Sequence, residues 1–144
     1  MAEFKSVTDR FAVAAQITRE DIARAAAQGF KTLVNNRPDG ESPDQLSSAD
    51  ARAAAEAAGL AYLALPFAGP PPPGVVAETA EFLENAQGPV LAFCRSGTRS
   101  ITAWAMASAL SGTYRPDEIL QKAAAAGYDL SGAREALTRL APRS

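Results

Sequence analysis

The chain has 144 residues, 47% of them hydrophobic, and a formal net charge of −2 at pH 7. This length suits one domain with its own core, so we treat residues 1–144 as a single domain. The small net charge gives no sign of a nucleic-acid partner, and no apolar run approaches the roughly 20 residues needed to cross a membrane. The start of the chain lacks the apolar core of a signal peptide, and the single cysteine fits a reducing compartment, so we expect a cytoplasmic protein.

Strand and helix patterns alternate through the first half of the chain. Thr18 with Asp21 forms a capping-box pattern at a helix start. Glycines at 29 and 59 stand where glycine commonly ends a helix. The predicted elements are a strand at 11–15, a helix from 18 to about 28, a strand at 31–35, a helix at 47–58 and a strand at 60–65.

The second half begins with a stiff loop that contains Pro66 and the run Pro70–Gly74. After it we expect a helix at 75–86, a strand at 89–93, a helix from 98 to about 110, a helix from Pro116 and a last helix at 130–140. Residues 143–144 are expected to fray. Strands that alternate with helices predict an α/β fold with a mostly parallel sheet covered on both faces.

Three segments should meet at the carboxyl ends of the strands, where ligands of open parallel sheets bind. They are residues 35–39, residues 66–69 and the loop that begins at Cys94, and Gln16 should join them. We expect Asn36 and Arg37 to contact substrate there. The alternatives are ordinary turn hydrogen bonding for the asparagine and a solvated arginine.

The run Cys94-Arg95-Ser96-Gly97-Thr98-Arg99-Ser100 lies between a predicted strand and a predicted helix. Such a loop aims backbone N–H groups and the positive end of the helix dipole at one point. A thiol at its start is stabilised as a thiolate, so we expect a partly exposed, reactive Cys94. The alternative is a buried core thiol.

The expected roles within this run follow from its chemistry. Cys94 is the nucleophile, Arg99 the main charge on the substrate and Ser100 a hydrogen-bond donor to the thiolate. The predicted anion-binding residues are Arg95, Ser96, Gly97 and Thr98. The chain contains no histidine, the commonest general base and metal ligand, so we expect no metal site and no cofactor.

Three motifs resemble the phosphatase-like domain of the beta-lactamase hydrolase-like proteins over roughly residues 4–110. They are Gln16 with the Thr18–Asp21 cap, the run Gly29–Glu41, and the Cys94–Ser100 loop. The resemblance implies a fold like the dual-specificity protein phosphatases. It also implies bacterial relatives that occur alone or fused to sulfur-oxidising modules, with an activity that is either phosphatase or sulfurtransferase.

The loop departs from the tyrosine-phosphatase pattern, in which five residues separate the cysteine from the arginine. Here four residues separate Cys94 from Arg99, and Ser100 stands where the arginine would be. Phe93 replaces the usual histidine before the cysteine. Residues 66–73 hold no ionisable side chain where such phosphatases carry an acid. The remaining candidate acids are Asp39, Glu78 and Glu81.

The short loop also resembles the active loop of the rhodanese sulfurtransferases. Sulfur transfer needs no general acid, because a thiolate is a good leaving group. The sequence therefore favours a sulfurtransferase that forms a persulfide on Cys94, with a small anionic sulfur donor and a small-thiol acceptor. One alternative is a cysteinyl-phosphate phosphatase acting on a phosphoester. Another is a non-catalytic anion-binding or redox-sensing module.

Overall fold

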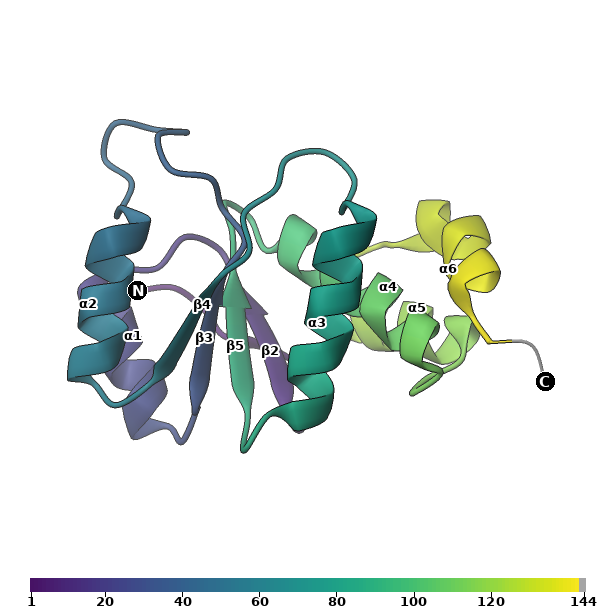
Figure 1. Cartoon of the computed structure of the whole chain (residues 1–144), viewed down its shortest axis with the longest axis horizontal. Helices are drawn as coiled ribbons and strands as arrows, with labels where there is room; N and C mark the ends of the chain where they lie inside the picture. Colours follow the sequence, from purple (N-terminus) through teal and green to yellow (C-terminus); the bar gives the residue numbers. More distant parts are fainter. Residues whose placement is uncertain (143–144) are drawn as a thin grey trace.

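A computed structural model describes residues 1–142 of the chain as a five-stranded sheet flanked by helices (Figure 1). The spatial order of the strands is β1-β2-β5-β3-β4. The four strands β2 to β5 are parallel to one another, and β1 pairs antiparallel with β2 at one edge. The strands are β1 (Lys5–Thr8), β2 (Phe11–Ala14), β3 (Thr32–Asn35), β4 (Ala61–Ala64) and β5 (Val90–Phe93).

Helices cover both faces of the sheet (Figure 1). One face is packed by α1 and α2, and the other by α4 with its neighbours α3, α5 and α6. The helices are α1 (Arg19–Ala27), α2 (Ser48–Ala57), α3 (Pro73–Asn85), α4 (Thr98–Ser111), α5 (Pro116–Ala125) and α6 (Arg134–Leu140).

The central strand β5 shows how the core forms on both faces. All four of its residues are buried, as is usual for a strand covered on both sides. Leu91 and Phe93 pack with Ile22 of α1, whereas Val90 and Ala92 pack with Trp104 of α4. The mostly parallel α/β sheet predicted from the alternating pattern is therefore confirmed.

The differences from the predicted elements are local. The sequence analysis missed β1, whose short edge run Lys-Ser-Val-Thr buries only Val7. Helix α3 starts at Pro73 rather than residue 75, because proline is well suited to the first turn of a helix. Helix α6 starts at Arg134 after a 3₁₀ turn at Ser131–Ala133. The predicted fraying of residues 143–144 lies outside the described residues.

The described helices are all too short or too polar to cross a lipid bilayer.

Candidate active site

The loop that begins at Cys94 lies at the carboxyl end of β5, between the ends of β2 and β3. Gly97 ends the loop with φ of 92°, a left-handed conformation that favours glycine, and α4 begins at Thr98. The predicted sequence of strand, tight loop and helix is thus present. It places the thiol beside the N-terminus of a 14-residue helix.

Three carbonyl groups of this loop accept hydrogen bonds from residues outside it. The carbonyl of Arg95 accepts from the Gln16 N–H at 3.3 Å, and that of Gly97 accepts from the Ile101 N–H at 2.9 Å. The Ser96 carbonyl accepts from the Tyr128 hydroxyl at 2.9 Å. In a trans peptide the N–H points opposite to the carbonyl, so the N–H groups of the loop face inward.

Of these N–H groups, that of Gly97 meets the Cys94 sulfur, whereas that of Thr98 lies 3.5 Å from Ser96 Oγ. The Gly97 N–H donates to Sγ at 3.1 Å. The thiol is free and has no exposed surface, so the expected partial exposure is wrong for this structure. Ser100 is also buried, but its hydroxyl has no hydrogen-bond partner within residues 1–142, so the predicted bond to the thiolate is absent.

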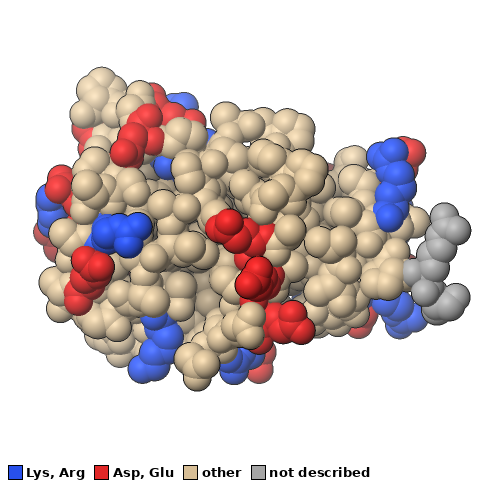
Figure 2. Space-filling view, viewed as in Figure 1, with Lys and Arg blue, Asp and Glu red and all other residues tan. Residues whose placement is uncertain are grey.

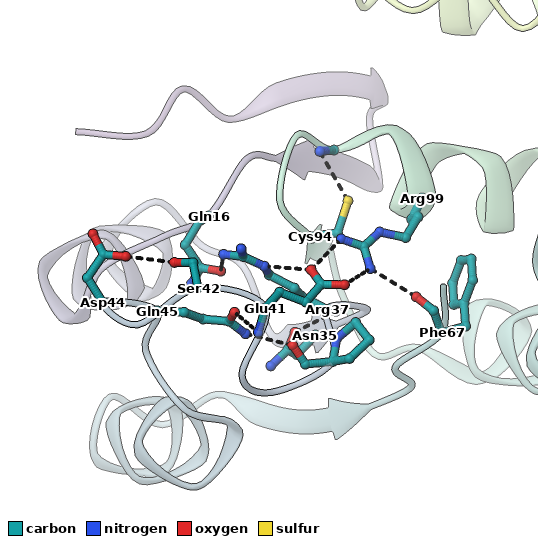
Figure 3. A network of polar contacts seen from close by, with 12 residues as sticks. Gln16, Asn35, Arg37, Glu41, Ser42, Asp44, Gln45, Phe67, Cys94 and Arg99 are labelled. Atoms are coloured by element: carbon teal, nitrogen blue, oxygen red, sulfur yellow. Dashed lines mark hydrogen bonds and ion pairs between the residues drawn. The ribbon is translucent and has the colours of Figure 1, made fainter. Parts of the chain in front are cut away.

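Arg99 extends from the first turn of α4 toward the loops that follow β3 and β4 (Figure 3). Its Nη1 donates to the Phe67 carbonyl at 3.0 Å. Both terminal nitrogens also donate to the Glu41 carboxylate. The pKa of Arg99 is raised, chiefly by its hydrogen bond to Glu41 and further by the charge of Cys94. Figure 3 shows Arg99 close to Cys94, and its predicted contact with a substrate anion stays a prediction.

Glu41 is a site residue that the sequence analysis did not single out. Its carboxylate joins Arg99 to Arg37, whose Nε donates to Oε1 at 2.9 Å. The hydrogen bonds from Arg99 and then from Arg37 lower the pKa of Glu41 to about 2. Arg37 and Glu41 are four residues apart in the Gly29–Glu41 motif, and this spacing was the signal that could have pointed to an Arg37–Glu41 pair. The fold was needed to bring Arg99 to the same carboxylate.

The other predicted residues at this edge of the sheet do meet (Figure 3). Arg37 is buried and donates from Nη1 to Gln16 Oε1 at 3.0 Å. The Asn36 side chain is buried and donates to the Leu65 carbonyl, so it ties the loop after β3 to the end of β4. Its predicted contact with substrate stays a prediction.

Carboxyl groups that could donate a proton are scarce near Cys94. Asp39 accepts from the Ser48 N–H at the start of α2, at 2.8 Å. Glu78 and Glu81 are exposed on α3, and within residues 1–142 neither forms a hydrogen bond with the Cys94 loop. Figure 2 shows acidic side chains gathered along this helix, facing solvent. Glu41 is held ionised by two arginines, so it is a poor acid at neutral pH.

A depression of about 590 Å³ lies beside the Cys94 loop, between the start of α1 and the loop of residues 42–46 that precedes α2. Arg37 and Arg95 line it together with Arg19, and Glu20 and Asp44 stand on its walls. Arg95 is exposed, as its predicted contact with a substrate anion would require.

Comparison with known proteins gives one family. Residues 3–111 match the sequence model of the family described as "Beta-lactamase hydrolase-like protein, phosphatase-like domain". A beta-lactamase hydrolase-like protein of Agrobacterium fabrum is 34% identical over 134 residues, which make up 92% of this chain and 31% of that protein. The chain thus spans about a third of the length of this curated relative.

Solved structures that resemble this chain include phosphatases, in agreement with the family match. A proposed phosphatase from Neisseria meningitidis is 31% identical to this chain, with a TM-score of 0.82, and the match covers 95% of this chain and 97% of the other. Tk-PTP in its active form has 20% identity and a TM-score of 0.75 over 98% of this chain and 97% of the other. The second similarity supports the fold alone, which is that of the dual-specificity and tyrosine phosphatases.

Proposed function

This chain belongs to the phosphatase-like domain family of the beta-lactamase hydrolase-like proteins, and from that premise we propose that it hydrolyses phosphate monoesters through Cys94. The single observation that carries the proposal is the Cys94 loop. Its carbonyls point outward, its Gly97 N–H meets the sulfur, and Arg99 lies beside it. A free thiol as nucleophile suits a reducing, cytoplasmic compartment.

The proposed reaction has two steps. In the first, the Cys94 thiolate attacks phosphorus, an S–P bond forms, and the P–O bond to the leaving group breaks. In the second, water attacks phosphorus, the S–P bond breaks, and phosphate leaves with the thiolate restored. Throughout, inward N–H groups of the loop and the Arg99 guanidinium stabilise the charge on the phosphoryl oxygens.

The scarcity of free carboxyl groups near Cys94 among residues 1–142 determines which esters would react well. General acid catalysis contributes about 10²–10⁴ in rate. Without it, the rate depends strongly on how readily the leaving oxygen departs as an anion. We therefore propose that activated aryl phosphates react much faster than alkyl phosphates, so that a plot of rate against leaving-group acidity is steep.

The scarcity of proton donors also favours a second candidate function, sulfur transfer. The spacing between Cys94 and Arg99 favoured the same function in the sequence analysis. The comparisons support the phosphatase better. A sulfurtransferase nevertheless needs no proton donor, because a thiolate or sulfite leaves readily. In that reaction Cys94 attacks a sulfane sulfur, the S–S bond of the donor breaks, and the resulting persulfide passes its outer sulfur to a thiol acceptor.

One experiment separates these proposals. The purified protein is assayed with a series of aryl phosphates, and its intact mass is measured after incubation with thiosulfate. A phosphatase turns over the esters and gains no sulfur. A sulfurtransferase gains the mass of one sulfur atom and hydrolyses esters poorly. Cys94→Ser abolishes either activity, whereas a wild-type protein that does neither is a non-catalytic anion-binding or redox-sensing module.

A further inference from the structure

Tyr128 contacts the Cys94 loop from outside the stretch that the sequence model of the family covers. The family match ends at residue 111, and Tyr128 follows α5. Its hydroxyl donates to the Ser96 carbonyl at 2.9 Å. That carbonyl belongs to the same peptide group as the Gly97 N–H, which donates to Cys94 Sγ at 3.1 Å. A trans peptide is planar, so the two hydrogen bonds hold the two ends of one rigid group.

We propose that Tyr128 is a positioning residue that locks the Ser96–Gly97 peptide with its N–H toward the Cys94 sulfur. This inference rests on the proposed function of the loop. Without the hydroxyl, the peptide is free to rotate and turn its carbonyl toward the anion site. A carbonyl there would repel both a thiolate and a substrate oxyanion.

The end of α5 places Tyr128 where it can do this. The Tyr128 N–H donates to the Ala123 carbonyl and the Gly127 N–H to the Ala124 carbonyl. Gly127 has φ of 99°, so the two bonds form a Schellman motif. This motif turns the chain back at Gly127 and leaves the tyrosine 9% exposed, packed between the sheet and the loop.

Lys5 of β1 also contacts the Tyr128 hydroxyl, in an arrangement that agrees with donation to Ser96. Its Nζ lies 3.5 Å from Tyr128 Oη and 4.8 Å from the ring centroid. An ammonium can only donate, so the hydroxyl accepts from Lys5 and directs its own proton to the Ser96 carbonyl.

Gly97 provides the space for this contact. A Cβ at that position would lie 2.1 Å from Tyr128 Oη, so any other residue would push the tyrosine away. The glycine therefore serves both the left-handed turn and the approach of Tyr128.

The test compares Tyr128→Phe with Tyr114→Phe. Tyr114 is a matched control, because Lys122 lies 4.8 Å from its ring centroid but the residue packs on Trp104, away from the loop. Two readouts apply: the rate of Cys94 alkylation by iodoacetamide at a fixed pH, and the protection against alkylation by inorganic phosphate. For Tyr128→Phe we expect both alkylation rate and phosphate affinity to fall about threefold to tenfold, the range that loss of one hydrogen bond gives.

Thermal unfolding shows whether each variant is folded, and the aryl phosphate assay tests the proposed function separately. Alkylation and protection within twofold of wild type in a folded Tyr128→Phe would overturn the inference, even if the wild type hydrolyses esters. The expected shifts in a protein without esterase activity would support the inference and refute the phosphatase. If Tyr128→Phe does not fold, Lys5→Met is measured instead. We expect it to lower the alkylation rate and the phosphate affinity by about twofold, because the bond from Lys5 to the hydroxyl is long. No change in either quantity would then overturn the inference.

Discussion

Arg99 and Glu41 form a bidentate ion pair beside Cys94, with Nη1 to Oε2 at 2.9 Å and Nη2 to Oε1 at 2.8 Å. This is the fork geometry in which arginine also binds a phosphate. The Glu41 carboxylate therefore occupies donors that the proposed function assigns to a substrate oxyanion. A bound anion has to compete with a carboxylate that belongs to the protein itself.

Replacing Glu41 with glutamine should strengthen the binding of anions. The amide keeps the size of the side chain but removes the charge that competes for Arg99, so we expect inorganic phosphate to bind about threefold to tenfold more tightly, in line with the strength of partly solvated ion pairs. Protection of Cys94 from alkylation measures the affinity. Glu20→Gln is the control, because it removes one negative charge from the wall of the depression beside the loop. Weaker binding in Glu41→Gln alone would show that the carboxylate chiefly orients Arg99.

The stability of the protein should depend on Glu41 at acid pH. Its pKa is about 2 in the folded protein, against an ordinary value of 4.5. A carboxyl group with a lowered pKa contributes stability that is complete above its ordinary pKa and is lost as the pH falls toward the folded value. Urea unfolding from pH 5 to pH 2 should show this loss, and Glu41→Gln should make the curve flatter. Identical slopes in the two proteins would contradict the prediction.

Gly97→Ala should destabilise the protein more than another glycine substitution with similar backbone geometry. Gly59 at the end of α2 has φ of 85°, close to the 92° of Gly97, but a Cβ there meets nothing within 4 Å. Gly59→Ala should therefore cost only the strain of a left-handed alanine, about 1 kcal/mol. Gly97→Ala adds the clash with Tyr128, and we expect a further loss of about 1–3 kcal/mol in the free energy of unfolding. Equal losses would mean that Tyr128 moves away at little cost.

Asn35 should be important for stability although it does not touch the thiol. It is buried, its Oδ1 accepts from the Arg37 N–H at 2.9 Å and its Nδ2 donates to Tyr62 Oη at 3.0 Å. Asn35→Leu leaves the Arg37 N–H without its acceptor inside the protein, which costs about 1–3 kcal/mol. Chemical denaturation measures the loss. Tyr62→Phe removes the bond to Asn35 and a 2.8 Å bond to Ser48 Oγ but leaves the Arg37 N–H paired, so it should cost less than Asn35→Leu. A larger loss from Tyr62→Phe would show that the Tyr62 hydroxyl, rather than the Arg37 N–H, carries the stabilisation.

Much of the architecture could be predicted from local pattern. The apolar run at residues 90–93 predicts a strand covered on both faces, and all four residues are buried. Thr18 and Asp21 form the capping box that their spacing predicts. Parallel strands joined by helices bring their carboxyl ends to one edge, so Cys94, Arg37 and Gln16 could be expected to meet. The weak strand β1 was missed because an edge strand needs little apolar surface.

The contacts around the Cys94 loop join residues that are far apart in the sequence. Arg99 and Glu41 are 58 residues apart, and Tyr128 and Ser96 are 32 apart. Hydrophobic periodicity determines which face of an element is buried, and a cysteine-to-helix loop determines where N–H groups converge. Neither determines which side chain from a distant loop reaches those groups, because that depends on how α5 packs against β1 and on the path of residues 36–47. The residues themselves therefore predicted Cys94 as the nucleophile, and that role stays a prediction. The burial of Cys94, the Arg99–Glu41 ion pair and the contact of Tyr128 with Ser96 were decided only by the packing of the described chain.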